Sequence, residues 1–196
     1  NISIDGFFDD CQDIVKGVSN DLDFKNNHNI GAVNSINWGR IIAQVVYYFK
    51  GYFAATKSSD QYIDVTVPSG NFGNLTAGLY ANALGLPVEN FIASTNRNDT
   101  FINYLMSGTY EPKPSVLTYS NAMDVGAPSN FTRILDLFDN DWEAIKGKID
   151  GIAVSDEETL QIMDRIYTAT GYIIDPHGAV GYLGLETYQK EGDTGV

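Results

Sequence analysis

Cysteine and histidine are scarce in this sequence, which holds only Cys11, His28 and His177 among its 196 residues. A single cysteine cannot form a disulfide framework within the chain, and two isolated histidines without a cysteine pair do not give a metal-ligand spacing. We therefore expect neither structural disulfides nor a metal site. Because nothing points to an oxidising compartment, we expect the protein to be cytoplasmic.

Basic residues are also few, since 12 lysines and arginines stand against 25 aspartates and glutamates, for a formal net charge of −13. A surface of this sign disfavours nucleic acid and anionic membranes as partners. No apolar run reaches the ~20 residues of a membrane-spanning helix. Hydrophobic residues still make up 43% of the chain, which suffices for a packed core in one large domain or in parts of two.

The most informative stretch joins an apolar, β-branched run at 62–67 to a helical pattern that begins at Leu75. Between them, Pro68 is followed by a turn that has two glycines and neither an acid nor a base. The order strand, turn, helix places main-chain N–H groups at the positive end of a helix dipole, where anions bind. The sequence therefore predicts a phosphate site at residues 70–74.

Two common phosphate loops do not fit this turn. A P-loop would have a lysine after its second glycine, where this chain has Asn74. A dinucleotide loop would have three glycines and an acidic residue after the next strand, but 91–94 runs into Thr95, Asn96 and Arg97. A phosphate monoester fits better than a dinucleotide. The alternative is a tight turn whose glycines only permit sharp backbone angles.

Helical and strand patterns alternate along the chain, which predicts an α/β fold with a parallel sheet and a site at the carboxyl ends of its strands. Strands are expected at 2–4, 62–67, 91–94 and 152–154, and a loop or short helix at 19–31. Helices are expected at 7–18, 38–55, 75–84, 101–107, 131–145, 156–170 and 176–188.

Several polar side chains have expected capping roles at these helices. Ser155 and Glu158 form a capping box, and Asp175 precedes a proline at the first helical position. Capping is also the expected role of the polar residues before 101–107; these residues are Asn96, Asn98 and Asp99.

Two further features have open or structural interpretations. Asp124 is as suited to anchoring a turn as to touching a ligand, and His177, in a first helical turn, is more often structural than a base. The helix at 38–55 carries a stripe of apolar residues that we expect to be buried; they are Ile41, Ile42, Val45, Val46, Phe49 and Phe53.

Segment 64–78, with Gly70-Asn71-Phe72-Gly73-Asn74 at its centre, resembles the phosphate-binding segment of threonine synthase, a pyridoxal-phosphate lyase of fold type II. The resemblance continues through 34–37, 85–88, 91–100, 120–125 and 175–180 in the same order. It implies a three-layer α/β/α fold with a parallel sheet, like the tryptophan synthase β-subunit. Residues 1–33 would be the end of a smaller domain and its connecting segment. Residues 34–196 would form the large cofactor-phosphate domain, incomplete at both ends.

The resemblance also implies a cofactor, a substrate and site residues. The cofactor is pyridoxal 5′-phosphate, and its phosphate would be held by the main-chain N–H groups of Gly70, Asn71, Phe72, Gly73 and Asn74. The side chains of Asn71 and Asn74 could add donors. The full enzyme would convert O-phosphohomoserine and water to threonine and phosphate. Contacts to the substrate phosphate are expected from Ser35, Asn37 and Arg40.

The lysine that forms the Schiff base in this family belongs to a segment before residue 1, so we expect no catalytic residue in this chain. The chain would be inactive without the missing N-terminal portion of the enzyme. Two alternatives are a phosphate-binding α/β module without catalysis and another fold-type II lyase such as a dehydratase. Dehydratases usually have a loop of nearly all glycine, and Asn71 and Phe72 depart from that pattern.

Overall fold

The computed structural model of the chain describes residues 3–6, 8–31, 33, 37–190 and 193–196. In this part, three parallel strands form one sheet in the order β1-β2-β3. They are β1 (Ile63–Pro68), β2 (Val88–Thr95) and β3 (Ile149–Ala153). The expected parallel sheet is confirmed. The expected strand at 2–4 is wrong for residues 3 and 4, which are not in a strand, and Ile2 lies outside the described residues.

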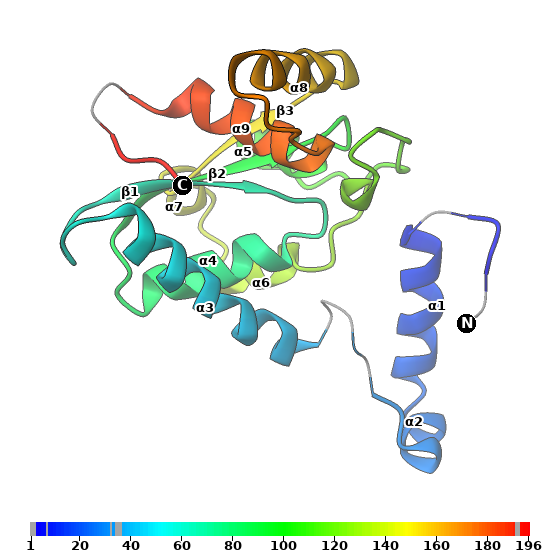
Figure 1. Ribbon diagram of the computed structural model, residues 1–196. Helices are drawn as coiled ribbons and strands as arrows, with labels where there is room; N and C mark the ends of the chain where they lie inside the picture. The colour runs from blue at the N-terminus through cyan, green and yellow to red at the C-terminus, as the bar shows by residue number, and fades with distance from the viewer. Residues whose placement is uncertain (1–2, 7, 32, 34–36, 191–192) are drawn as a thin grey trace.

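Helices cover both faces of the sheet and give the expected three layers (Figure 1). Helices α8 (Asp156–Thr170) and α9 (Pro176–Tyr188) lie over one face. Helices α3 (Trp38–Ala55) and α4 (Gly73–Ala83) lie along the other. The remaining elements of this body are α5 (Thr100–Ser107), the 3-10 turn η1 (Asn121–Met123), α6 (Phe131–Leu137) and α7 (Trp142–Lys146).

Helix α9 crosses the sheet at very short range, which fixes the layer above the site. A Cβ atom at Gly184 would lie 1.9 Å from Ser94 Oγ, so only glycine fits at this crossing. The Thr66 hydroxyl donates to the Gly181 carbonyl at 2.9 Å. Pro68 at the end of β1 pairs with Ser94 near the end of β2. The turn after β1 therefore emerges at the carboxyl edge of the sheet, beside the start of α9.

Helix α3 has the expected bounds, but the apolar stripe on it is only partly buried. Ile41 and Val45 are buried as expected, whereas Ile42, Val46 and Phe53 are 48%, 63% and 65% exposed. Helix α3 packs against α4, and its buried residues are Ile41, Val45 and Tyr52. The helical period of about 100° per residue places these three on one line and turns the exposed positions away from it. The exposed positions face away from the described body.

The single helix expected at 131–145 is also wrong, because the structure has α6 and α7 there. Asp139 and Asn140 lie between them with φ of 52° and 60°, in the left-handed region that interrupts a helix. Aspartate and asparagine tolerate this conformation better than most residues. The sequence pattern did not show the break because apolar residues lie on both sides of it.

Helices α1 (Phe8–Asn20) and α2 (Leu22–His28) lie to one side of the sheet (Figure 1). They confirm the expected helix at 7–18, with Phe7 itself outside the described residues, and the short helix within 19–31. Asp9 in α1 joins them to the body, since its carboxylate accepts hydrogen bonds from Ser115 Oγ and Gly126 N at 2.8 and 3.1 Å. In the described part of the chain, no helix has the length and apolar character that crossing a membrane requires.

Candidate phosphate-binding site

The predicted phosphate turn lies between the end of β1 at Pro68 and the start of α4 at Gly73. Phe72 makes the sharpest bend, with φ of 58° and ψ of 18° in the left-handed region. This conformation is unusual for a bulky residue and costs of order 1–3 kcal/mol. The Phe72 ring is buried and lies 4.5 Å from the Phe101 ring, centroid to centroid, so core packing holds the turn in this shape.

The turn leaves main-chain donors available. The Phe72 N–H donates to Ser69 Oγ at 3.0 Å. The N–H groups of Gly70, Gly73 and Asn74 have no hydrogen-bond partner within the described residues. Helix α4 has no acidic residue in its first turn and no side-chain cap. The positive end of its dipole therefore faces an opening with unsatisfied donors, which is the arrangement that binds phosphate.

The two asparagine side chains brace the turn. Asn74 Oδ1 accepts hydrogen bonds from Ser69 Oγ and Leu75 N at 2.6 and 3.0 Å, and its Nδ2 donates to the Pro68 carbonyl at 2.9 Å. Asn71 Oδ1 accepts from the N–H and the hydroxyl of Ser129 at 2.6 and 3.0 Å. The expectation that these side chains add donors for a ligand remains a prediction, because the hydrogen bonds just described hold the loop itself.

A hollow of about 530 Å³ opens beside the turn, and none of the described carboxylates or lysines lines it. Its wall contains the whole stretch from Pro68 to Asn74, together with Arg40 and Gln44 of α3, Ala122 and Met123 of η1, and His177 of α9. Arg40 and His177 come from opposite layers, and Arg40 carries a positive charge. In the part of the chain that the structure describes, the hollow therefore offers an anion a guanidinium and main-chain amide groups, with no acid in its wall.

The expected substrate-contact residues have different positions. Arg40 lines the hollow, and its Nη1 donates to the Val33 carbonyl at 3.2 Å. Asn37 caps α3 by accepting the Gly39 N–H at 2.9 Å, and it is not part of the hollow's wall. Ser35 lies outside the described residues. The contact of these three side chains with a substrate remains a prediction.

Gly70 has a role that the sequence did not show. A Cβ atom at this position would lie 2.6 Å from Met123 Cα and 2.7 Å from its carbonyl oxygen. The η1 backbone therefore packs directly against the phosphate turn and forms one wall of the hollow. A contact across some 50 positions leaves no local pattern in the sequence of segment 120–125.

The expected capping by Asn96 and Asn98 is wrong, because both side chains bind Asp124 in a buried network. Asp124 Oδ1 accepts hydrogen bonds from Asn96 Nδ2, Asn98 Nδ2 and Thr118 Oγ1 at 2.9, 3.1 and 2.7 Å. Its Oδ2 accepts from the Thr118 N–H at 3.1 Å. Asp99 occupies the N-cap position of α5 without a side-chain cap bond and pairs with Lys113 instead. Of its two suggested roles, Asp124 has the anchoring one.

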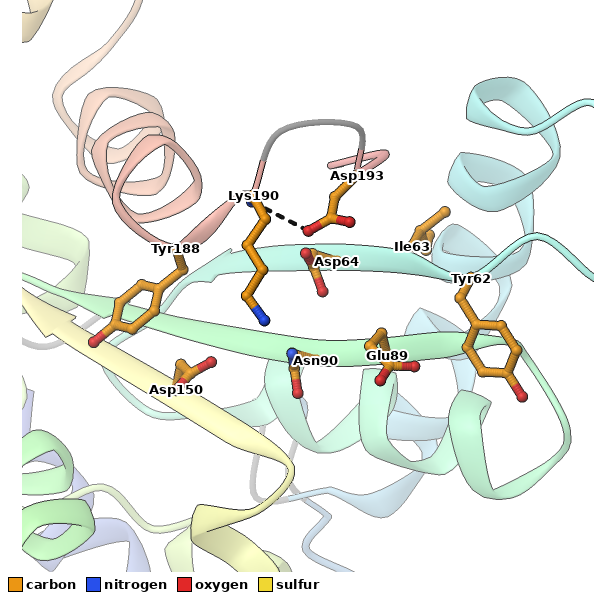
Figure 2. A pocket seen from close by; sticks show the side chains of 9 residues that line it. All are labelled: Tyr62, Ile63, Asp64, Glu89, Asn90, Asp150, Tyr188, Lys190 and Asp193. Carbon is orange, nitrogen blue, oxygen red and sulfur yellow. Dashed lines mark hydrogen bonds between the residues drawn. The ribbon is translucent and has the colours of Figure 1, made fainter.

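A second hollow, of about 570 Å³, lies at the opposite, amino-terminal ends of the strands (Figure 2). Four carboxylates and one ammonium group line it; they are Asp64, Glu89, Asp150, Asp193 and Lys190. Burial raises the pKa of Asp64 and of Asp150. A hollow with this excess of acids repels phosphate, so of the two ends of the sheet the carboxyl end is the candidate anion site.

The cofactor expected from the resemblance fits the carboxyl-end site in chemical terms. Its phosphate needs main-chain donors, a helix N-terminus and no adjacent acid, and the turn at 70–74 supplies all three. Among the described residues, no group of histidine, cysteine or acidic side chains could hold a metal ion. No lysine lines the hollow.

Comparison with known proteins gives the same cofactor. The chain matches the family described as "Pyridoxal-phosphate dependent enzyme" over residues 2–195. It is 42% identical to the threonine synthase of Escherichia coli K12 over 195 residues, covering 100% of this chain and 45% of that protein.

Two solved structures have the same arrangement. The crystal structure of threonine synthase from Escherichia coli superposes with a TM-score of 0.91 at 42% identity, over 99% of this chain and 45% of that one. The pyridoxal-phosphate-bound threonine synthase from Brucella melitensis superposes with a TM-score of 0.84 at 34% identity. The match covers 99% of this chain and 47% of that one. This chain thus spans about half the length of the proteins it matches. Since the family match runs through nearly every residue, the chain belongs to the pyridoxal-phosphate dependent enzymes.

Proposed function

We propose that this chain is the part of a threonine synthase that holds the phosphate of pyridoxal 5′-phosphate. The observation that carries the proposal is the turn into α4. There the N–H groups of Gly70, Gly73 and Asn74 have no partner among the described residues, and none of the described acids lines the hollow beside them. The similarity to threonine synthases, one of them with the cofactor bound, supports the choice of ligand.

Each residue of the turn has a distinct task in this proposal. Gly70, Gly73 and Asn74 donate main-chain hydrogen bonds to the phosphate, and Asn71 and Phe72 complete the curve of the backbone. Phe72 fixes that curve through its buried ring, and the Asn74 side chain locks the turn to the end of β1. When bound, the cofactor supplies the electron sink for the reaction. The protein supplies placement, charge and exclusion of water.

The substrate we propose for the whole enzyme is O-phosphohomoserine, which a carbon–oxygen lyase reaction with water converts to threonine and phosphate. Arg40 lies at the α3 side of the hollow, where its guanidinium could receive the substrate phosphate as a bidentate partner. Asn37 and Ser35 precede it on the same segment and remain proposed contacts. Residues 34–196 would form the large domain around this site, and residues 1–33 the end of the smaller one.

We further propose that the 196-residue chain is inactive by itself. Schiff-base chemistry with the cofactor needs a lysine at the hollow, and none of this chain's eight lysines lines it. In the matched relatives the chain corresponds to 45% of the length, so the remainder can supply the amine. We place the complete enzyme in the cytoplasm, with no nucleic acid or membrane as partner.

Titration calorimetry with pyridoxine 5′-phosphate and with pyridoxine tests the phosphate site. Neither ligand has an aldehyde, so lysines cannot bind it covalently. We expect the phosphorylated ligand to bind at least about tenfold more tightly, because only it engages the charge-assisted N–H bonds of the turn. Equal affinity for the two ligands would contradict the proposal.

The inactivity is tested by mixing the chain with pyridoxal 5′-phosphate and recording its absorption spectrum. We expect no specific lysine-linked band. A stoichiometric band that disappears when one lysine is replaced would show that the chain has its own reactive amine. Binding of inorganic phosphate as tight as that of pyridoxine 5′-phosphate would instead favour the alternative of a non-catalytic phosphate-binding module.

A further inference from the structure

The wall that faces Gly70 is a short 3-10 turn whose first donors need partners from elsewhere. Within η1, Met123 N donates to the Ser120 carbonyl at 2.9 Å and Asp124 N donates to the Asn121 carbonyl at 3.1 Å. The Ala122 N–H points out of the turn and donates to Nε2 of His177, on α9, at 3.2 Å. This bond joins the wall to a helix that is distant in the sequence.

The hydrogen bonds of His177 determine which of its ring nitrogens carries the proton. An N–H can only donate, so Nε2 must accept from Ala122 with its lone pair. The proton of the neutral ring therefore lies on Nδ1, which is 3.1 Å from Asp175 Oδ1 and donates to it. Both nitrogens are engaged, and neither is available to donate to an anion in the hollow.

The other end of the wall is fixed by Asp124. This carboxylate is 6% exposed and receives the four hydrogen bonds from Asn96, Asn98 and Thr118 described above. Met123 lies between the two fixed points, and its backbone touches the place where Gly70 would have a side chain. The position of the wall thus sets the space available at the phosphate turn.

We propose that His177 is a positioning residue of the phosphate site, which holds η1 against Gly70 by accepting the Ala122 N–H. The inference rests on the proposed function, because it concerns how tightly the same turn binds phosphate. The task of His177 is to accept the Ala122 N–H, and this task differs from acting as a general base and from contacting the anion directly.

Positioning and direct contact with the anion differ in what a substitution must keep. A side chain that only accepts the Ala122 N–H can be replaced by another neutral acceptor. A charged imidazolium that contacts an anion cannot be replaced in this way, because the substitution removes its charge.

The test compares the wild-type chain with His177→Gln and His177→Leu. Glutamine has a carbonyl oxygen that can accept the Ala122 N–H at every pH, and leucine has no acceptor. At pH 8 we expect His177→Gln to bind pyridoxine 5′-phosphate within about twofold of wild type, and His177→Leu to bind about five- to tenfold more weakly, the usual worth of one hydrogen bond.

The rescue by glutamine gives the second readout, because a merely structural role of the imidazole would not be restored by an acceptor atom alone. Equal binding by His177→Leu and wild type at pH 8, or a loss in His177→Gln as large as that in His177→Leu, would overturn the inference. Failure of the wild type itself to bind the phosphate would instead refute the proposed function.

Discussion

The N-termini of α4 and α9 line the same hollow, but α9 has a side-chain cap and α4 has none. At α9 the Asp175 carboxylate accepts the N–H groups of His177 and Gly178 at 2.8 and 3.1 Å. At α4 the corresponding position is Phe72, which offers no side-chain cap, and no acid occupies the first turn. The start of α9 thus carries its own anionic cap, whereas the start of α4 leaves its N–H donors available to an anion that comes from outside the chain.

The difference shows how a common structural feature becomes a binding site. Helix N-termini attract negative charge in general, and most chains satisfy that attraction with an aspartate, serine or threonine. At α4 the capping side chain is absent. Its place is taken by a buried aromatic residue that shapes the turn without filling it. The neighbouring helix, with its complete cap, provides a control within the same molecule.

Placing a carboxylate at the start of α4, as α9 already has, should cause the largest change in phosphate affinity. Asn74→Asp keeps the side-chain shape, adds a negative charge next to the phosphate and turns a donor to the Pro68 carbonyl into an acceptor. We expect a loss of about 3 kcal/mol, or about 100-fold, in affinity for pyridoxine 5′-phosphate. Titration calorimetry measures this loss. Asn26→Asp, on α2, adds the same charge far from the hollow and should change affinity less than about twofold.

Gly70→Ala should have the next largest effect, because it forces the wall and the turn apart. The new Cβ would meet the Met123 backbone at 2.6 Å, and backbone atoms cannot rotate away. We expect unfolding in urea to show a loss of about 2–3 kcal/mol in stability. Gly17→Ala is the matched control, since no heavy atom lies within 4 Å of its Cβ position in α1. It should stabilise the helix by up to about 1 kcal/mol. Equal effects of the two changes would show that the contact at Gly70 is not rigid.

The smallest expected effect concerns the complete cap at α9. The N–H of Gly178, followed by the hydrogen bonds from His177, lowers the pKa of Asp175. Because the folded-state pKa lies below the unfolded value, the ionised carboxylate stabilises the protein above an ordinary aspartate pKa of about 3.9. This contribution is lost as pH falls through the folded-state value. Asp175→Asn retains an acceptor oxygen and should cost about 0.5 kcal/mol at pH 7.

Unfolding curves at several pH values check this last prediction. The difference between wild type and Asp175→Asn should shrink steadily toward zero as the solution is acidified below pH 4. A constant difference over that range would mean that the charge of Asp175 contributes nothing and that only its hydrogen-bonding geometry matters.

The features that the sequence predicted well are those set by neighbouring residues. The capping box of Ser155 and Glu158 and the Asp175 cap before Pro176 are present as expected. The phosphate turn also follows a local rule, because a strand, a proline and two glycines before a helix restrict the backbone strongly. Local chemistry of this kind is sufficient to place donors at one edge of a parallel sheet.

The features that it did not predict depend on contacts between distant segments. Phe72 adopts a left-handed conformation because Phe101 packs on it, and no propensity of phenylalanine indicates this. Asn96 and Asn98 precede a helix, but their side-chain amides donate to the buried Asp124 carboxylate instead of capping the helix N-terminus. The exposure of Val46 and Phe53 depends on what lies beside α3, which the helical period alone does not specify.

The outer edge of β1 has a consequence for how the molecule assembles. Thr194 and Val196 hydrogen-bond the backbone of Asp64 and Thr66 on the side away from β2, and Gln61 Nε2 reaches Thr194 Oγ1 across 133 positions of sequence. Contacts of such high contact order form slowly, since a long loop must close first. Until they form, the strand that leads into the phosphate turn presents bare amide groups that invite pairing with another chain. Completion of this ladder thus covers the edge of β1 that β2 leaves open.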